Sequence, residues 1–190
     1  MRVIAGELRG RTFDAPQGRD TRPTTDRVRE ALFSSVVSLV GDFSGLNVCD
    51  AFAGSGAFGI ESLSRGADFV TFVERDKKTA QLISRNLAKL NIATRGRVIS
   101  IDTLKTPQVL AAHSPFDLLF LDPPYKISSC AIAELIDEMC ALGILREGAI
   151  IVYEHAIQER CIKWNDTISL LKEKKYGTTV VSYLTVKEVS

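Results

Sequence analysis

The chain has 190 residues, of which 45% are hydrophobic and 25% charged, and its formal net charge is +1 at pH 7. This length fits one domain with a substantial core, and the composition excludes bulk disorder. No apolar run approaches the roughly 18 residues of a membrane span, and charges interrupt the N-terminus before a signal-peptide core can form, so we expect a cytoplasmic protein.

The N-terminal part is predicted to contain a small hairpin and a helix. Residues 2–14 are typical of a hairpin that turns near Arg9 and Gly10. Residues 23–40 are predicted to form a helix with Thr24 or Thr25 as its N-cap, because apolar side chains recur there at helical spacing.

From residue 46 onward, short apolar runs alternate with helical patterns. The runs predict strands at 46–51, 69–74, 97–102, 116–122 and 148–154, and helices at 77–91 and 130–143. Residues 168–186 predict two antiparallel strands joined by a turn at Tyr176 and Gly177. Strands separated by helices indicate βαβ units, so we predict an α/β fold with a mostly parallel sheet and ligands at the carboxyl ends of its strands.

A glycine-rich turn follows the first of these strands. Gly54, Gly56 and Gly59 satisfy the GxGxxG pattern between a strand and a helix, where glycines let the backbone approach a ligand. Glu74 ends the second strand twenty residues after Gly54, where a carboxylate accepts hydrogen bonds from ribose hydroxyls. Together these residues predict a cofactor that contains adenosine.

Two further acids bear on which cofactor binds. Asp50, just ahead of the glycines, repels a pyrophosphate but attracts the ammonium of a methionine moiety. This favours S-adenosylmethionine and a methyltransferase over NAD and a dehydrogenase; alternatively, Asp50 caps the following turn. Asp102, predicted at the end of the third strand, either accepts from the adenine amino group or caps a short helix. We also predict Phe52, in the glycine-rich turn, as a cofactor contact.

The sequence Asp122-Pro123-Pro124-Tyr125 ends the fourth predicted strand. Pro123 and Pro124 hold this segment extended and donate no ladder hydrogen bonds. The Asp122 carboxylate and a backbone carbonyl, that of Pro123, are then paired acceptors that match the two protons of an exocyclic amine. Tyr125 supplies a flat face for a stacked base. We predict these four residues as the catalytic site of an amine methyltransferase; alternatively, the motif is a loop that ends a strand.

Arginines are concentrated at the N-terminus, since half of the fourteen lie within residues 1–29 and the first lysine is at position 77. They lie among Gly, Thr and Pro without a helical pattern of carboxylates. Guanidinium groups on such a scaffold suit phosphate contacts, although a solvated tail is the alternative. We predict Arg9, Arg11, Arg22 and Arg27 as phosphate contacts.

The cysteines predict neither a metal site nor disulfides. Cys49, Cys130, Cys140 and Cys161 lack CxxC spacing, and only two histidines are present. We expect buried thiols packed in the core and no bound metal.

These motifs resemble those of the class I S-adenosylmethionine-dependent methyltransferases, specifically the amino-methylating group marked by (D/N)PP(Y/F). The sequences RPTTDRVREALF at 22–33, FAGSGAFGIESLSRGA at 52–67 and KKYGTTVVSYL at 174–184 further resemble the bacterial 16S ribosomal RNA guanine-N2 methyltransferase family. Ala5, where many members have glycine, and Tyr125, where many have Phe, are departures from its pattern.

The resemblance implies a three-layer, Rossmann-like fold with a seven-stranded sheet. It implies methylation of the N2 amine of one guanine in the 30S subunit or an assembly intermediate, with residues 1–22 as an arginine-rich extension and 23–190 as the methyltransferase domain. We expect a monomer. The alternative that the motif leaves open is an N6-adenine methyltransferase acting on DNA or RNA, because both bases carry an exocyclic amine.

Overall fold

The computed structural model describes residues 1–16, 26–158 and 163–188. Its centre is a seven-stranded sheet in the order β3-β2-β1-β4-β5-β7-β6. The neighbours from β3 to β5 are parallel, whereas β7 is antiparallel to both β5 and β6. The strands are β1 Asn47–Asp50, β2 Phe69–Val73, β3 Gly96–Ile99, β4 Phe116–Leu121, β5 Leu145–Ala156, β6 Ile168–Tyr176 and β7 Thr179–Val186. The predicted mostly parallel sheet with an antiparallel C-terminal hairpin is confirmed.

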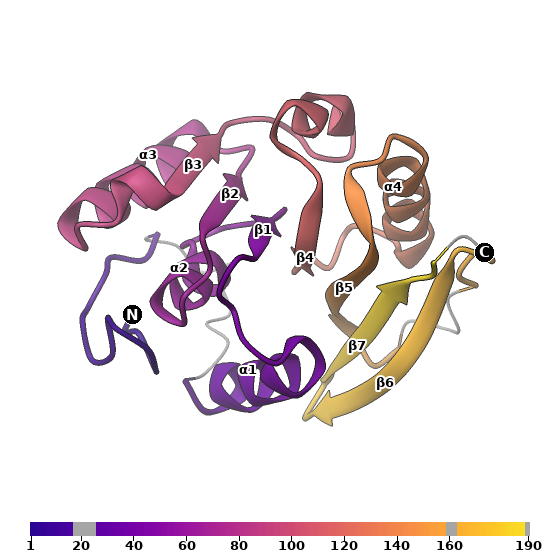
Figure 1. Cartoon of the computed structure of the whole chain (residues 1–190), viewed down its shortest axis with the longest axis horizontal. Helices are drawn as coiled ribbons and strands as arrows, with labels where there is room; N and C mark the ends of the chain where they lie inside the picture. Colours follow the sequence, from indigo (N-terminus) through magenta and orange to yellow (C-terminus); the bar gives the residue numbers. More distant parts are fainter. Residues whose placement is uncertain (17–25, 159–162, 189–190) are drawn as a thin grey trace.

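Helices cover both faces of this sheet (Figure 1). One face carries α1 (Asp26–Val40), α2 (Ala57–Ser64) and α3 (Lys77–Lys89). The other face carries α4 (Ser129–Ala141) and the 3₁₀ helix η2 (Pro107–His113). A second 3₁₀ helix, η1 (Ala93–Arg95), follows α3. Strand residues alternate between the two cores: Leu118 and Phe120 of β4 join the first, and Leu119 and Leu121 the second. The predicted three-layer architecture is confirmed.

Two predicted strands differ from the structure by three residues at one end. β3 ends at Ile99 instead of 102, because the carbonyl of Asp102 accepts from the N–H of Lys105 at 3.0 Å and closes a turn. Asp102 therefore lies in a turn and does not end a strand. β5 begins at Leu145, three residues before its predicted start.

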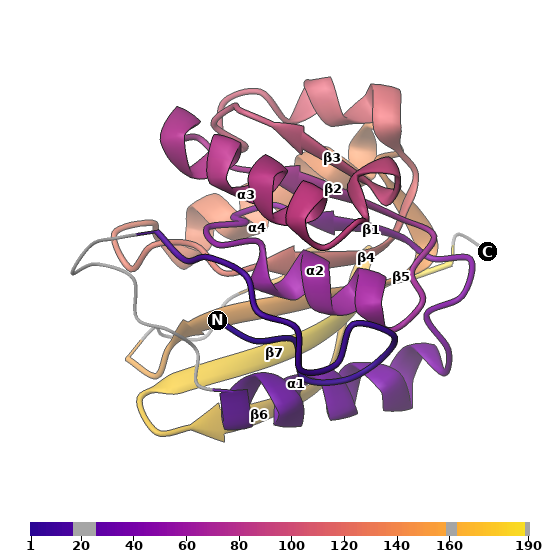
Figure 2. The same cartoon turned by 90° about the vertical axis from the view of Figure 1, so that its left-hand side faces the viewer.

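The N-terminal segment folds back on itself, but with one antiparallel bridge, Arg2 to Thr12, instead of a regular hairpin ladder. It packs along α2 (Figure 2), where the buried carboxylate of Glu61 accepts from the N–H groups of Ile4 and Ala5 at 2.8 and 3.0 Å. Its apolar side chains, Val3, Leu8 and Phe13, belong to the core on this face. The segment is thus held by its backbone as well as by hydrophobic burial.

Some predictions concern residues outside the described ranges. These are the predicted RNA contact Arg22 and the predicted N-cap at Thr24 or Thr25. The structure describes α1 from Asp26 onward. Within the described ranges, every helix is too short or too polar to cross a membrane.

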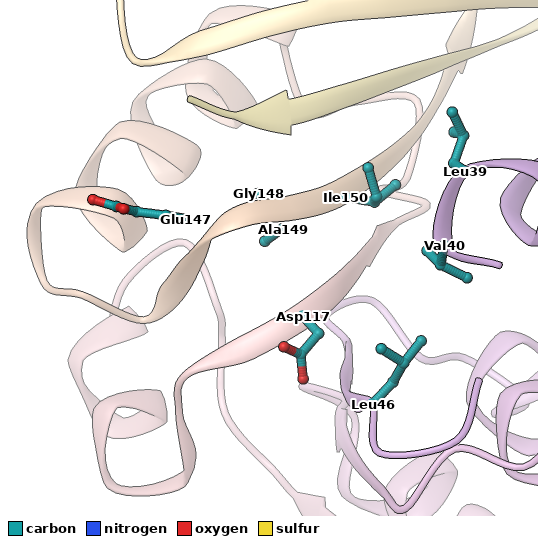
Figure 3. Close-up of a pocket in the computed structure, with 8 residues that line it drawn as sticks. All are labelled: Leu39, Val40, Leu46, Asp117, Glu147, Gly148, Ala149 and Ile150. Atoms are coloured by element: carbon teal, nitrogen blue, oxygen red, sulfur yellow. The ribbon is translucent and has the colours of Figure 1, made fainter. Parts of the chain in front are cut away.

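A cavity of about 280 Å³ lies between the end of α1 and the first residues of β4 and β5 (Figure 3). Its lining is mostly apolar, with Asp117 and Glu147 as the acidic members. Asp117 accepts from the N–H of Asn47, the first residue of β1, at 2.8 Å and pairs with Arg146 at 3.1 Å. This cavity is therefore at the amino edge of the strands, opposite the predicted site residues.

Candidate active site

The predicted cofactor and catalytic residues come together at the carboxyl edge of the sheet. Asp50 is the last residue of β1, Glu74 follows β2, Asp102 lies in the turn after β3, and Asp122 follows β4. Because β2, β1 and β4 are adjacent and parallel, their carboxyl ends lie side by side. The site is thus assembled from four turns at one edge.

The glycine turn after β1 has two kinds of glycine. Gly54 and Gly56 have φ values of +51° and +81°, which favour glycine, and a Cβ on Gly54 would meet only the Phe52 carbonyl oxygen, at 4.0 Å. Gly59 instead packs α2 against β2, since a Cβ there would lie 2.2 Å from the Phe72 ring. The backbone at Gly54 is therefore open to a ligand, while Gly59 allows close helix packing. Phe52 is half-buried against the core on the α4 face.

Glu74 connects this turn to the next one. Its Oε2 accepts from the N–H of Gly54 at 3.0 Å, and its Oε1 accepts from the N–H of Asp76 at 2.8 Å. Each carboxylate oxygen has two lone pairs, so both can accept another hydrogen bond. Glu74 is half-buried and is oriented from both sides, as a fixed acceptor for hydroxyl groups requires.

Asp50 is buried, with 1% of its surface exposed, and its Oδ2 accepts from the N–H of Gly59 at 3.0 Å. The capping role that the sequence left open is therefore present. Burial raises the pKa of Asp50 to about 7, the Gly59 hydrogen bond lowers it, and the nearby carboxylates of Asp122 and Glu74 raise it further. A buried carboxylate with acidic neighbours is stabilised by a cationic ligand.

The turn after β3 contains a residue that we did not predict. Thr103 is buried, and its hydroxyl donates to the carbonyl of Ala51 at 2.8 Å, which ties this turn to the end of β1. The adjacent Asp102 accepts from the N–H of Leu104 at 3.2 Å, and its second oxygen lies 4.0 Å from the Lys105 amine. Thr103 thus holds Asp102 beside the glycine turn, and nothing in the local sequence distinguishes it from other threonines.

The Asp122 segment continues from a rigid strand. Phe120, two residues earlier, stacks on Phe58 of α2 at 5.2 Å and contacts Phe33 of α1 at 5.5 Å between ring centroids. After the strand, the carbonyl of Pro124 accepts from Ile127, whereas among the described residues no donor reaches the carbonyl of Pro123. The Pro123 carbonyl, next to Asp122 in the chain, is thus available to another donor.

Tyr125 is 61% exposed, although it is a large aromatic residue. It follows the two prolines at the same edge of the sheet and precedes Ser128, the N-cap of α4. An aromatic ring exposed beside paired acceptors provides a stacking surface for a planar ligand.

Asp122 shares its environment with Asp50. It is half-buried, and burial raises its pKa to about 6. By strand alternation, Asp50 and Asp122 both face the side of the sheet that α1 and α2 cover. In the described part of the chain, neither acid forms an ion pair, and no group of three or more His, Cys, Asp or Glu side chains is arranged to hold a metal ion.

Of the predicted RNA-contacting arginines, the structure describes Arg9, Arg11 and Arg27, and these lie in different places. Arg11 donates to the carbonyls of Leu90 and Lys89, at the end of α3, at 2.8 and 3.1 Å. Since α3 begins at the carboxyl edge, its last residues and Arg11 lie toward the amino edge. Arg9 is exposed in the same turn, which packs on the end of α2 (Figure 2). Arg27, exposed in the first turn of α1, lies at the opposite end of that helix from the cavity in Figure 3.

The sheet order and the layers that cover it are those of a Rossmann-like methyltransferase. The chain belongs to the family described as "Conserved hypothetical protein 95", whose sequence profile matches residues 1–185.

Named relatives agree with this class. The chain is 37% identical to the "Putative rRNA methyltransferase YlbH" of Bacillus subtilis (strain 168), over 96% of this chain and 97% of that protein. It is 38% identical to the "Ribosomal RNA small subunit methyltransferase D" of Haemophilus influenzae, over 96% and 91%. Among solved structures, the "Putative methyltransferase yhhF from Escherichia coli" superposes with a TM-score of 0.82 at 33% identity, covering 98% of each chain.

Proposed function

We propose that this protein transfers a methyl group from S-adenosylmethionine to the exocyclic N2 amine of one guanine in 16S ribosomal RNA. The observation that carries the proposal is the end of β4, where the Asp122 carboxylate and the available Pro123 carbonyl lie beside an exposed Tyr125. The relatives named as small-subunit rRNA methyltransferases support the RNA substrate.

The residues present fit S-adenosylmethionine. This cofactor supplies an electrophilic methyl group on a sulfonium, and its methionine part carries an ammonium. The raised pKa of Asp50 and its proximity to Asp122 and Glu74 suit those positive charges. Glu74 suits the ribose hydroxyls, and the open backbone at Gly54 suits close approach of the cofactor. We propose Gly56 as a further cofactor contact, and Phe52 and Asp102 as contacts of the adenine end.

Asp122 and Pro123 act on the amine. Its lone pair is delocalised into the guanine ring, and acceptors for both of its protons favour the rehybridised nitrogen with a localised pair. Pro124 keeps the acceptors rigid, and Tyr125 holds the base, so much of the acceleration comes from positioning. When the nitrogen gains its methyl group it becomes positively charged; the Asp122 carboxylate stabilises this charge until a proton leaves.

The substrate we propose is 16S rRNA in the 30S subunit or an assembly intermediate, modified by a monomer in the cytoplasm. Of the arginines predicted to contact RNA, Arg9 and Arg27 are exposed and are proposed as phosphate contacts. Arg11 is also exposed and is proposed as a third phosphate contact, although its guanidinium already donates to the carbonyls of Leu90 and Lys89.

The test is methylation of 30S particles from a strain that lacks the enzyme, with S-adenosylmethionine labelled in its methyl group. After digestion to nucleosides, the label is expected in N2-methylguanosine. The paired acceptors also fit the N6 amine of adenine, so the alternative product is N6-methyladenine in DNA or RNA. Label in that product would reject the guanine assignment. Calorimetric binding of NAD but not of S-adenosylhomocysteine would reject the cofactor.

A further inference from the structure

The carboxyl edge that holds the acidic site also carries a set of exposed basic side chains. They come from the turns after β2, β3 and β4, which are the turns that supply Glu74, Asp102 and Asp122. We call this set the basic rim; its members are Arg75, Lys77, Lys78, Lys105 and Lys126. All five are exposed.

Each member follows a site residue closely in the chain. Arg75 comes directly after Glu74, and Lys77 and Lys78 form the first turn of α3. Lys105 closes the turn that begins at Asp102, and Lys126 follows Tyr125. The cations therefore belong to the same turns as the carboxylates, at the same edge of the sheet.

The rim is largely free of ion pairs. Within the described ranges, Lys105 is its one member in a salt bridge, with Asp102 at 4.0 Å, and 80% of the Lys105 side chain is exposed. Asp76, the acid between Arg75 and Lys77, is the N-cap of α3 and accepts from the N–H and hydroxyl of Thr79; Lys78 interacts with it electrostatically without a salt bridge. The positive charge of the rim is thus available to a partner.

Basic side chains toward the amino edge are used differently. Arg95 pairs with Glu7 and donates to the carbonyls of Leu63 and Ala67, and Arg146 pairs with Asp117. With Arg11 on the end of α3, these arginines hold the fold together. Both edges therefore carry several cations, but those toward the amino edge bind other parts of the protein, whereas those of the basic rim are largely unpaired.

We infer that the basic rim binds the phosphate backbone of the RNA substrate around the target nucleotide. The inference rests on the proposed function and names its contact surface. Exposed cations neutralise phosphates and set the register of the strand, while the exposed ring of Tyr125 is placed to stack the base. The carboxylates in the centre repel phosphate, so the backbone stays on the rim and the base enters the site.

The test compares two variants with the same loss of charge. The rim variant is Lys105→Gln with Lys126→Gln; the control is Arg85→Gln with Lys187→Gln, two exposed positions away from the rim, in the middle of α3 and after β7. The affinity for 30S particles is measured at several KCl concentrations, and S-adenosylmethionine binding is measured by calorimetry. Each lost contact with a single strand lowers the slope of log K against log [salt] by roughly 0.7.

The rim variant is expected to reduce this slope by about 1.4 and to raise the KM for particles, with cofactor binding within twofold of wild type. The control is expected to keep the wild-type slope. An unchanged slope in the rim variant, or an equal reduction in the control, overturns the inference. Failure of the wild-type protein to bind S-adenosylmethionine or to methylate particles would instead reject the proposed function.

Discussion

The buried carboxylate of Asp50 accepts a hydrogen bond from the N–H of Gly59 at 3.0 Å, in the first turn of α2. This bond offsets only part of the cost of burying a charge at the end of β1, because the pKa of Asp50 is still raised to about 7. In the ligand-free protein, Asp50 therefore opposes folding when it is ionised.

Asp50→Asn is expected to stabilise the protein at high pH. With a pKa near 7 in the folded state and 3.8 as its ordinary value, the folded state binds the proton more tightly. Stability is thus lost as pH rises from about 4 to about 7 and stays low above. Asn has no charge to bury, so the variant avoids this loss. Its free energy of unfolding is expected to exceed that of wild type by up to about 4 kcal/mol at pH 8 and by less at pH 5. Urea denaturation at both pH values checks this; a variant less stable than wild type at pH 8 would contradict it.

The affinity for S-adenosylmethionine is expected to rise with pH more steeply than that for S-adenosylhomocysteine. Ionised Asp50, with its pKa raised to about 7, attracts the ammonium that both compounds carry. Ionised Asp122, with its pKa raised to about 6, also attracts the sulfonium that the second compound lacks. One linked proton gives at most about a tenfold change per pH unit. Calorimetry of both ligands between pH 5.5 and 8 measures the difference.

A matched control for this pH series is Asp137→Asn. Asp137 lies on α4, and burial also raises the pKa of this carboxyl, but it is outside the candidate site. This variant should keep the wild-type pH profiles. Parallel profiles for the two ligands in the wild-type protein would show that the carboxylates do not respond to the sulfonium.

Gly6→Ala is expected to destabilise the protein much more than Gly10→Ala. Both glycines have φ near +81°, so alanine at either costs about 1 to 2 kcal/mol in backbone strain. A Cβ on Gly6 would also lie 1.8 Å from the Ser64 carbonyl oxygen, whereas a Cβ on Gly10 meets nothing within 4 Å. The total for Gly6→Ala is about 3 kcal/mol or more. Urea denaturation of both variants measures the two losses of unfolding free energy. Equal losses would mean that the contact of Gly6 with the Ser64 carbonyl of α2 is not tight.

The fold could be predicted because its signals are local. Apolar runs bounded by turns predicted the five parallel strands and the C-terminal hairpin, and the structure differs from them by a few residues at their ends. Asp50, Glu74 and Asp122 could be placed together because parallel strands end at one edge of a sheet. The predicted end of β3 was wrong. The side chain and the carbonyl of Asp102 accept hydrogen bonds from the residues that follow it, which favours a turn over an extended strand.

Contacts between distant segments could not be predicted. The bonds from Glu61 to Ile4 and Ala5, and from Thr103 to Ala51, depend on how α2 and the turn after β3 pack in space. For the same reason, the sequence did not separate Arg11, which donates to the end of α3, from its neighbour Arg9, although both side chains are exposed. Residue type indicated a basic segment, but only the fold shows which guanidinium is already engaged.

The most direct test of the central claim is single-turnover methylation of 30S particles by wild-type protein and Asp122→Ala. If Asp122 accepts the protons of the target amine, the variant loses about a hundredfold or more in rate while particle binding stays within a few-fold of wild type. The wild-type product is expected to be N2-methylguanosine. Methyl transfer by Asp122→Ala at the wild-type rate would contradict the account.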